Sequence, residues 1–448
     1  MIFLLTANIL YCHPEHREGS AFSLPRKDIV MQGSVVLCRQ NINHFGAASV
    51  ETELNKIQKQ DLHFPYGSSA HGKYLRWLLP AFLCFPTLVA MASRPAQPPV
   101  IVAYVFPQKT VLQPGDIAAR KLTRINFAFA LIQNGKIVTE DPADGPNLAT
   151  LVALKKENPA LTVLVSVGGW LGSGGFSDAS LTAESRSVFI QSVLQFIEQH
   201  QLDGLDIDWE YPGMVGAGNK FRSEDKQNYT LLLAELRRQF DQEEKKLHRR
   251  LFLTIATGSQ SDFLEHTEMG KVQKYVDTIN LMAYDYYEPD SDPITGNHAP
   301  LFTNPQDPKK ISADRSVHEY EQAGVPAEKI VLGVPFYGHV WGQVPATGHG
   351  LFQPGKPVPN AFAGYGNVSS TMLNNGYSRY WDAAASAPYL YNPAQKIFVS
   401  YEDPESLALK CKYVLDHQLA GIMFWDYESD PSGKLLDTVD TGLHHAVK

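Results

Sequence analysis

The chain has 448 residues, of which 44% are hydrophobic and 19% are charged, and its formal net charge is -8. This length and composition are typical of a globular protein with one large domain plus attachments, or with two domains. The net negative charge, with no cluster of lysines and arginines to offset it, argues against a surface for nucleic acid. We therefore expect no nucleic-acid partner, whereas a neutral polymer substrate is compatible with this charge.

The first part of the chain differs from the rest. Residues 1–71 show no sustained periodicity, and we interpret them as an atypical segment that is either not translated or disordered. Residues 72–92 combine a basic start, an apolar run and the ending Ala90-Met91-Ala92, which are the three parts of a secretory signal peptide. A short buried helix is the alternative, but Pro80 and Pro86 would interrupt it.

The internal position of this apolar run leaves two hypotheses open. Translation begins near residue 70, or the run is a signal-anchor behind a real N-terminal segment. Residues 93–99 are rich in proline and predict an extended linker. We expect a secreted or periplasmic protein that is monomeric and has no stable association with a membrane after the signal is cleaved.

Cysteine and histidine usage predicts neither a disulfide nor a metal site in the main domain. Cys12, Cys38 and Cys84 lie in the first hundred residues, so Cys411 has no partner within the main domain. Zinc-type ligand spacing and an HExxH motif are both absent. The scattered histidines are therefore interpreted as surface or packing residues, and no cofactor is expected.

From residue 100 to residue 448, short apolar strands alternate with amphipathic helical stretches. The near-continuous apolar runs are typical of parallel strands that are buried on both faces. Eight such strands predict a (β/α)8 TIM barrel, with a doubly wound open sheet as the alternative that lacks a GxGxxG motif. The predicted strands are Val100–Val105, Arg124–Ala130, Thr162–Val167, Gly204–Trp209, Leu251–Thr257, Thr278–Ala283, Ile330–Val334 and Gly421–Phe424.

One connection is too long to be a simple loop. Within the connection of the last two predicted strands, almost sixty residues rich in glycine, proline, asparagine and aromatic side chains lie between residues 335–338 and 396–400. Because a structureless loop of that length is uncommon, we predict a small α+β insertion at about residues 339–395, between strands 7 and 8.

The stretch from Asp203 to Pro212 alternates acidic and apolar residues. Asp206, Asp208 and Glu210 have one parity, so in a strand their carboxyl groups project to the same face. Neighbouring carboxylates raise the pKa of one another, and a protonated acid beside ionised ones suits cleavage of a glycosidic bond. Asp203 has the other parity, and we expect it to support the start of the strand.

The carboxyl ends of the other barrel strands provide an independent test of whether the acidic stretch belongs to an active site, because active sites of such barrels lie at these strand ends. A single aromatic residue at a strand end is more often part of the core than a ligand-binding residue. Together, however, these positions outline one polar and aromatic cup around Glu210. The predicted substrate-binding residues are Tyr104, Phe129, Gly169, Trp170, Met282, Asp285, Tyr337 and Trp425.

These residues carry a family resemblance. Asp203 to Pro212 resembles the DGxDxDWEYP signature of family 18 glycoside hydrolases, the chitinases and their relatives. Residues 166–169 (SxGG), 282–285 (MxYD) and 333–338 (GxPxYG), together with Trp425 on the last strand, match further motifs in family order. His339 departs from the pattern, because many relatives have arginine there, and this puts substrate contacts at that position in doubt.

The resemblance implies substrate-assisted retaining hydrolysis, in which the 2-acetamido group of the sugar is the nucleophile. Glu210 would donate a proton to the glycosidic oxygen, Asp208 would orient the acetamido group, and Asp206 would share a proton with Asp208. Tyr284 would bond the acetamido oxygen, Asp285 would contact the sugar, and Trp425 would form the floor.

Three functions follow from these implications. A secreted chitinase acting on chitin or chito-oligosaccharides agrees best with the insertion and the aromatic strand ends. An endo-β-N-acetylglucosaminidase that releases N-glycans would use the same acids. A non-catalytic chitinase-like lectin is disfavoured, because inactive relatives usually lose the acid that corresponds to Glu210.

Overall fold

The computed structural model describes residues 98–359, 361, 363–373 and 375–445. The predicted segments at 1–71 and 72–92, and most of the predicted linker, lie outside the described residues. Within the described part, no helix combines the length and the hydrophobicity that a membrane crossing requires.

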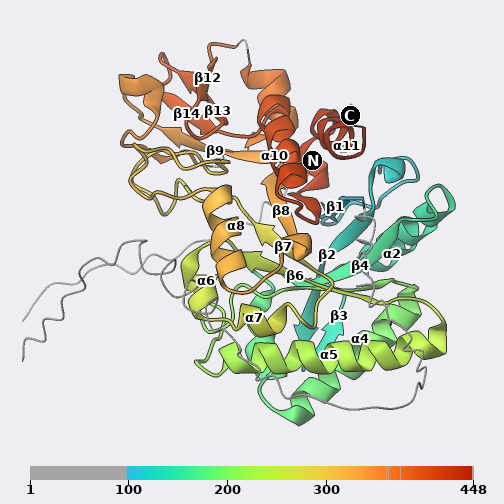
Figure 1. The fold of residues 1–448 in the computed structure, drawn as a ribbon. Coiled ribbons are helices and arrows are strands. Elements are labelled where there is room, and N and C mark those ends of the chain that lie inside the picture. The colour runs from blue at the N-terminus through green and yellow to red at the C-terminus, as the bar shows by residue number, and fades with distance from the viewer. Residues whose placement is uncertain (1–97, 360, 362, 374, 446–448) are drawn as a thin grey trace, which may run out of the picture. The chain divides into compact units, whose positions relative to one another are not determined.

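Eight parallel strands close into a barrel, which confirms the predicted fold (Figure 1). The pairing of the first two strands, in which Val102 lies opposite Arg124, closes the ring and excludes an open doubly wound sheet. In spatial order the strands are β1 (Val100–Val105), β2 (Arg124–Gln133), β4 (Thr162–Gly168), β5 (Gly204–Asp208), β6 (Phe252–Gly258), β7 (Thr278–Met282), β8 (Ile330–Pro335) and β15 (Gly421–Trp425). A short strand, β3 (Lys136–Val138), extends β2 as an antiparallel hairpin outside the ring.

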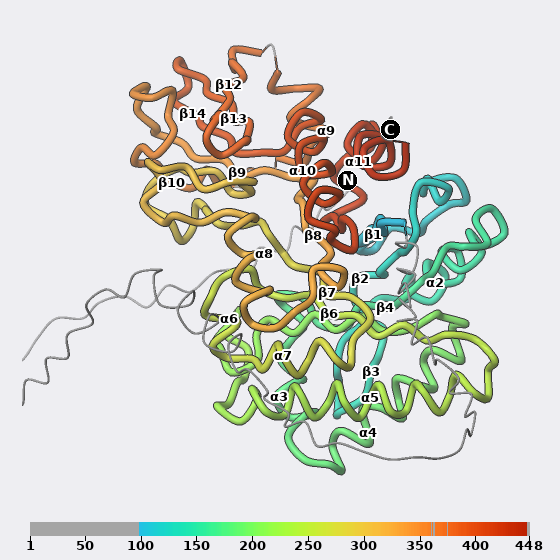
Figure 2. Tube along the Cα trace, viewed as in Figure 1, coloured from blue at the N-terminus to red at the C-terminus, as the bar shows by residue number. Residues whose placement is uncertain are grey.

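Helices cover the outside of the barrel, and α4 and α5 run side by side (Figure 2). The longer helices are α2 (Asp144–Ala153), α4 (Ala183–His200), α5 (Asp225–Leu247), α8 (Ala313–Gln322), α10 (Pro404–Asp416) and α11 (Lys434–His444). Shorter ones are α3 (Phe176–Ala179), α6 (Ser261–Glu265) and α7 (Met269–Val272). Between β1 and β2 there is only a 3-10 turn at Ala119–Lys121, so the barrel departs there from strict strand–helix alternation.

Local sequence explains where these helices begin. Thr182 precedes α4, and its side chain accepts a hydrogen bond from Ser185 N while the Ser185 side chain accepts one from Thr182 N. Asp403 precedes α10 in the same way, with Pro404 in the first turn, where its missing N–H costs nothing. Such reciprocal bonds satisfy amide groups that a helix start otherwise leaves unpaired.

The insertion between β8 and β15 is mainly an antiparallel sheet. Its strands are β9 (Tyr337–Gly342), β10 (Lys356–Pro357), β11 (Ala363–Gly364), β12 (Ser378–Asp382), β13 (Ala387–Asn392) and β14 (Ile397–Ser400), with one short helix, α9 (Tyr365–Asn367). Trp341 pairs with Phe398 across β9 and β14, and both are fully buried. The sheet extends a few residues beyond the predicted bounds of 339–395, because Ser400 pairs with His339 and Tyr337 with Gly364.

Asp203 anchors the start of β5. Its Oδ2 accepts a hydrogen bond of 2.8 Å from Val163 N, at the start of β4. Its carboxylate also forms ion pairs with Lys155 and Arg249. Asp203 therefore lies at the opposite end of β5 from the acidic row, as its parity predicts.

Candidate active site

The alternation along β5 separates two environments. Trp209 is 1% exposed and stacks on Phe176 on the helical side, with ring centroids 5.2 Å apart. Asp206, Asp208 and Glu210 have the other parity, and they are 0%, 4% and 9% exposed. The apolar residues thus fix the strand against α3 and its neighbours, while three acids are buried on the inner side.

Asp206 is the most completely bonded of the three acids. Its Oδ2 accepts hydrogen bonds of 2.8 Å from both Tyr104 and Ser166. Its Oδ1 accepts bonds of 2.5 Å from Thr254 and 3.1 Å from Asn280. Burial raises the pKa of Asp206, and the bonds from Thr254, Ser166 and Tyr104 oppose that rise. Four donors from four strands therefore fix this carboxyl group in one orientation.

Asp208 and Glu210 have a different environment. Asp208 Oδ1 is buried without a hydrogen-bond partner. Burial, and then the charges of Glu210 and Asp206, raise the pKa of Asp208 well above its usual value. Burial also raises the pKa of Glu210 to about 7, with the charge of Asp285 acting in the same direction and a hydrogen bond from Tyr211 opposing it. A carboxyl group with this pKa can hold a proton near neutrality and release it to a substrate.

The glycines of the SxGG motif permit the backbones of β4 and β5 to approach each other closely. A Cβ atom on Gly168, whose φ is +112°, would lie 2.1 Å from the carbonyl oxygen of Asp208. Gly169 has a φ of +77° and donates its N–H to the same oxygen at 2.8 Å, and a Cβ there would meet the Phe129 ring. Both positions therefore require glycine.

Ser173 then fixes the backbone at Glu210. Its Oγ accepts a hydrogen bond of 2.9 Å from Glu210 N. The same Oγ lies 2.8 Å from the Gly169 carbonyl oxygen and 3.0 Å from that of Asp208. One buried hydroxyl group thus connects the loop after β4 to the end of β5.

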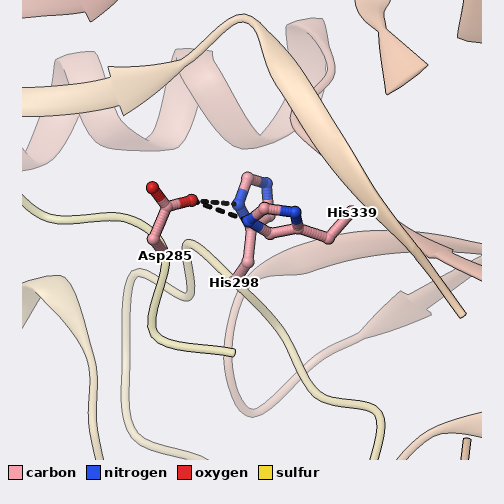
Figure 3. Close-up of side chains that lie close together, drawn as sticks. All are labelled: Asp285, His298 and His339. Carbon is pink, nitrogen blue, oxygen red and sulfur yellow. Dashed lines mark hydrogen bonds and ion pairs between the residues drawn. The ribbon is translucent and has the colours of Figure 1, made fainter. Parts of the chain in front are cut away.

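Asp285 lies just beyond β7 and has imidazole and hydroxyl partners. Tyr337 donates its hydroxyl to both carboxylate oxygens, at 2.6 and 2.7 Å. His339 Nε2 lies 2.8 Å from Asp285 Oδ1, and His298 Nδ1 lies 3.5 Å from it (Figure 3). Although burial acts to raise the pKa of Asp285, the two histidines lower it far below its usual value. This carboxyl group is therefore ionised.

Aromatic rings surround Trp425 at the end of β15. Its ring stacks on Phe129 at 5.4 Å and contacts Tyr104 and Phe106 at 5.9 and 5.5 Å. Trp170, by contrast, is 51% exposed and meets the edge of Tyr211. The side chains at the strand ends thus form an apolar surface that can receive the face of a sugar ring.

A cavity of about 700 Å³ lies among these residues and brings the predicted site together. The predicted residues that line it are Tyr104, Phe129, Gly169, Trp170, Asp208, Glu210, Met282, Tyr284, Asp285, Tyr337 and Trp425. Asp206 does not line the cavity, because it lies one layer deeper and contacts Tyr104.

Sequence reasoning missed several residues of this region. Ser173 lies in the glycine-rich stretch 172–175, whose composition alone does not indicate a contact with Glu210. Thr254 and Asn280 lie inside β6 and β7 and bond Asp206. A polar residue within an otherwise apolar strand was the only sequence signal that could have indicated these bonds. His298 and His339, interpreted as surface or packing residues or as a family departure, flank Asp285. Further lining residues are Phe106, Leu131, Glu140, Tyr211, Met214, Gln260, Asp262, Phe263 and Glu288.

The comparisons with known proteins agree with this geometry. A family model described as glycosyl hydrolases family 18 matches residues 100–430. Chitinase A1 of Niallia circulans is 38% identical over 330 residues, which are 70% of this chain and 47% of that protein, so the match spans about half of its length. Chitinase 1 of Aphanocladium album is 32% identical over 368 residues, covering 74% of this chain and 81% of that protein. The solved structure of a family 18 N-acetylglucosaminidase from Paenibacillus barengoltzii has 38% identity and a TM-score of 0.70, covering 77% of this chain and 100% of that one.

Proposed function

Because the chain belongs to glycosyl hydrolase family 18, we propose that it is a chitinase that hydrolyses β-1,4 linkages between N-acetylglucosamine units. The observation that carries this proposal is the pair of acids at the end of β5. Glu210 has a pKa of about 7 and lines the cavity, and Asp208 beside it has an unpartnered buried oxygen. The relatives named chitinases support chitin or chito-oligosaccharides as the substrate class.

In the proposed mechanism, Glu210 donates its proton to the glycosidic oxygen as the bond to the anomeric carbon breaks. The carbonyl oxygen of the substrate's own acetamido group attacks that carbon, which forms an oxazolinium ion. Glu210, now ionised, takes a proton from the water that opens this ion, and the anomeric configuration is retained.

The remaining residues position the sugar. Asp208 turns its free oxygen to the acetamido N–H and shares a proton with Asp206, which its four donors hold in place. Tyr284 bonds the acetamido oxygen, and Asp285 contacts the sugar. Trp425 forms the floor of the cleft together with Phe129.

The experiment is product release from chito-oligosaccharides by the wild-type protein and by Glu210→Gln. The variant keeps the size of the side chain but cannot donate the proton, so kcat should fall by about 10²- to 10⁴-fold. Equal activity of the two proteins would refute the mechanism. Circular dichroism serves as the control for folding.

Three alternatives are distinguished by parallel assays. Release of glycans from a high-mannose glycoprotein, without action on chito-oligosaccharides, would identify an endo-β-N-acetylglucosaminidase. Release of single sugars alone would indicate an N-acetylglucosaminidase, which is the activity named for the relative from Paenibacillus barengoltzii. Binding of oligomers without any hydrolysis would identify a lectin, a reading that the retention of Glu210 disfavours.

We further propose that the protein is secreted through the signal-like residues 72–92, which lie outside the described residues. N-terminal sequencing of the exported product tests this proposal. A product that starts at Ser93 supports cleavage after Ala92. A product that retains the apolar run supports a signal-anchor instead.

A further inference from the structure

Beside the proposed catalytic row, the loop after β7 and strand β9 bring one carboxylate and two imidazoles together (Figure 3). These side chains are Asp285, His298 and His339. We propose that they form a zinc site, and that a bound Zn²⁺ inhibits the enzyme by holding Asp285 away from the sugar. The inhibitory part rests on the proposed function, whereas the binding part does not.

The donor atoms already lie close to a coordinating arrangement. One atom from each residue can be chosen so that all three lie within 4.8 Å of one another. His339 Nε2 and His298 Nδ1 lie 2.8 and 3.5 Å from Asp285 Oδ1. Ligands about 2.0–2.1 Å from a tetrahedral zinc ion are about 3.3 Å apart, so small side-chain movements complete the site.

The state of His298 is the second observation. Its side chain is 0% exposed, and neither ring nitrogen has a hydrogen bond of ordinary geometry to any residue in the described part of the chain. A buried imidazole normally bonds through at least one nitrogen, because an unpaired polar group loses the hydrogen bonds that water gave it. A metal ion at Nδ1 would supply the missing partner.

The types of ligand atom at this site, and the cavities that connect it to solvent, are suitable for a zinc ion. Two histidines and one carboxylate, with a fourth position left for water, are a donor set of open zinc sites. His339 lines a second cavity of about 250 Å³, Asp285 lines the main cavity, and Glu288 lines both. An ion can therefore enter from solvent on the His339 side, where Glu288 and Asp290 add negative charge.

The residue at position 339 supplies the matched control. Arginine, which many family members have there, can donate hydrogen bonds to Asp285 but has no lone pair for a metal ion. His339→Arg therefore leaves a hydrogen-bond donor beside Asp285 and removes one zinc ligand. His349→Gln is the second control, because His349 is exposed in the same insertion and stacks on Tyr380 away from Asp285.

The test uses the full chain after removal of metals with a chelator. Calorimetric titration with ZnCl₂ should show one site in the wild-type protein and in His349→Gln that is absent, or at least tenfold weaker, in His339→Arg. Histidines outside the described residues contribute equally to all three proteins. Identical titrations of wild type and His339→Arg would overturn the site.

The second measurement is hydrolysis of chito-oligosaccharides with and without Zn²⁺, each protein being compared with its own metal-free rate. We expect zinc to inhibit wild type and His349→Gln at the concentrations that fill the site, with recovery on chelation, and to spare His339→Arg. Equal inhibition of all three, or binding without inhibition, would overturn the inhibitory role. If metal-free wild type has no activity, the proposed function fails while the titration still decides the zinc site.

Discussion

The cavity has two acidic walls that differ in their partners. At the end of β5, Asp208 and Glu210 have no positively charged partner among the residues that the structure describes, and burial raises the pKa of both. Across the site, burial acts on Asp285 in the same direction, but His298 and His339 reverse the result and lower its pKa. Because all three acids are buried, the difference in their pKa values comes from their neighbours, and these neighbours decide whether a buried acid holds a proton.

A second contrast lies within β5 itself. Asp206 accepts four hydrogen bonds, whereas Asp208 Oδ1 accepts none. A fully bonded carboxyl group is suited to a structural and orienting role, and an unpaired oxygen is available for a ligand. Substitution of Asp208 is therefore expected to reduce activity, whereas substitution of Asp206 is expected to reduce stability.

Among the substitutions that test this contrast, Asp208→Asn has the largest expected effect. The amide keeps the shape of the side chain but cannot share a proton with Asp206 or stabilise positive charge on the acetamido group. We expect kcat on chito-oligosaccharides to fall by about 10²-fold or more, in the range of one lost electrostatic contribution. Urea unfolding should show no loss of stability, and a large loss would contradict the assignment of Asp208 as a ligand-facing group.

Asp206→Ala should behave in the opposite way. It leaves the hydroxyls of Tyr104, Ser166 and Thr254 and the amide of Asn280 with a buried acceptor missing. The free energy of unfolding should fall by about 1–3 kcal/mol, as for buried groups that lose their partner. The same urea titration measures this, and a variant as stable as Asp208→Asn would remove the contrast between the two residues.

Tyr337→Phe gives a smaller effect. It deletes the hydroxyl that bonds both oxygens of Asp285 but leaves His339 in place. We expect a loss of about 1 kcal/mol in the free energy of unfolding. Tyr377→Phe is the control, because its hydroxyl makes only one long bond of 3.3 Å, to Gln395. Equal stabilities of the two variants would show that the Tyr337 bonds contribute nothing.

The sequence predicted the barrel and most of the site because both depend on short-range patterns. The period-two row placed Asp206, Asp208 and Glu210 on one face, and the strand ends supplied the aromatic surface around Trp425. These predictions needed only the geometry of a strand and the known end of a barrel at which sites lie.

What the sequence did not predict depends on long-range contacts. His298 and His339 contact Asp285 from separate segments of the chain, and no local sequence spacing predicts these contacts. Ser173 acts through a loop whose glycine content has several explanations. The insertion was predicted from its length alone, so the pairing that extends it from Tyr337 to Ser400 could not be read from composition.

The measurement that tests the account most directly is the pH dependence of kcat/KM for wild type and Asp285→Asn. Glu210 donates its proton only when protonated, so wild-type activity should fall as the pH rises through about 7. Because the charge of Asp285 raises the pKa of Glu210, this fall should move to lower pH in Asp285→Asn, even though that variant is slower at every pH. A fall at the same pH in both proteins, or no fall near 7 in wild type, would contradict the claim that burial and the charge of Asp285 keep Glu210 protonated.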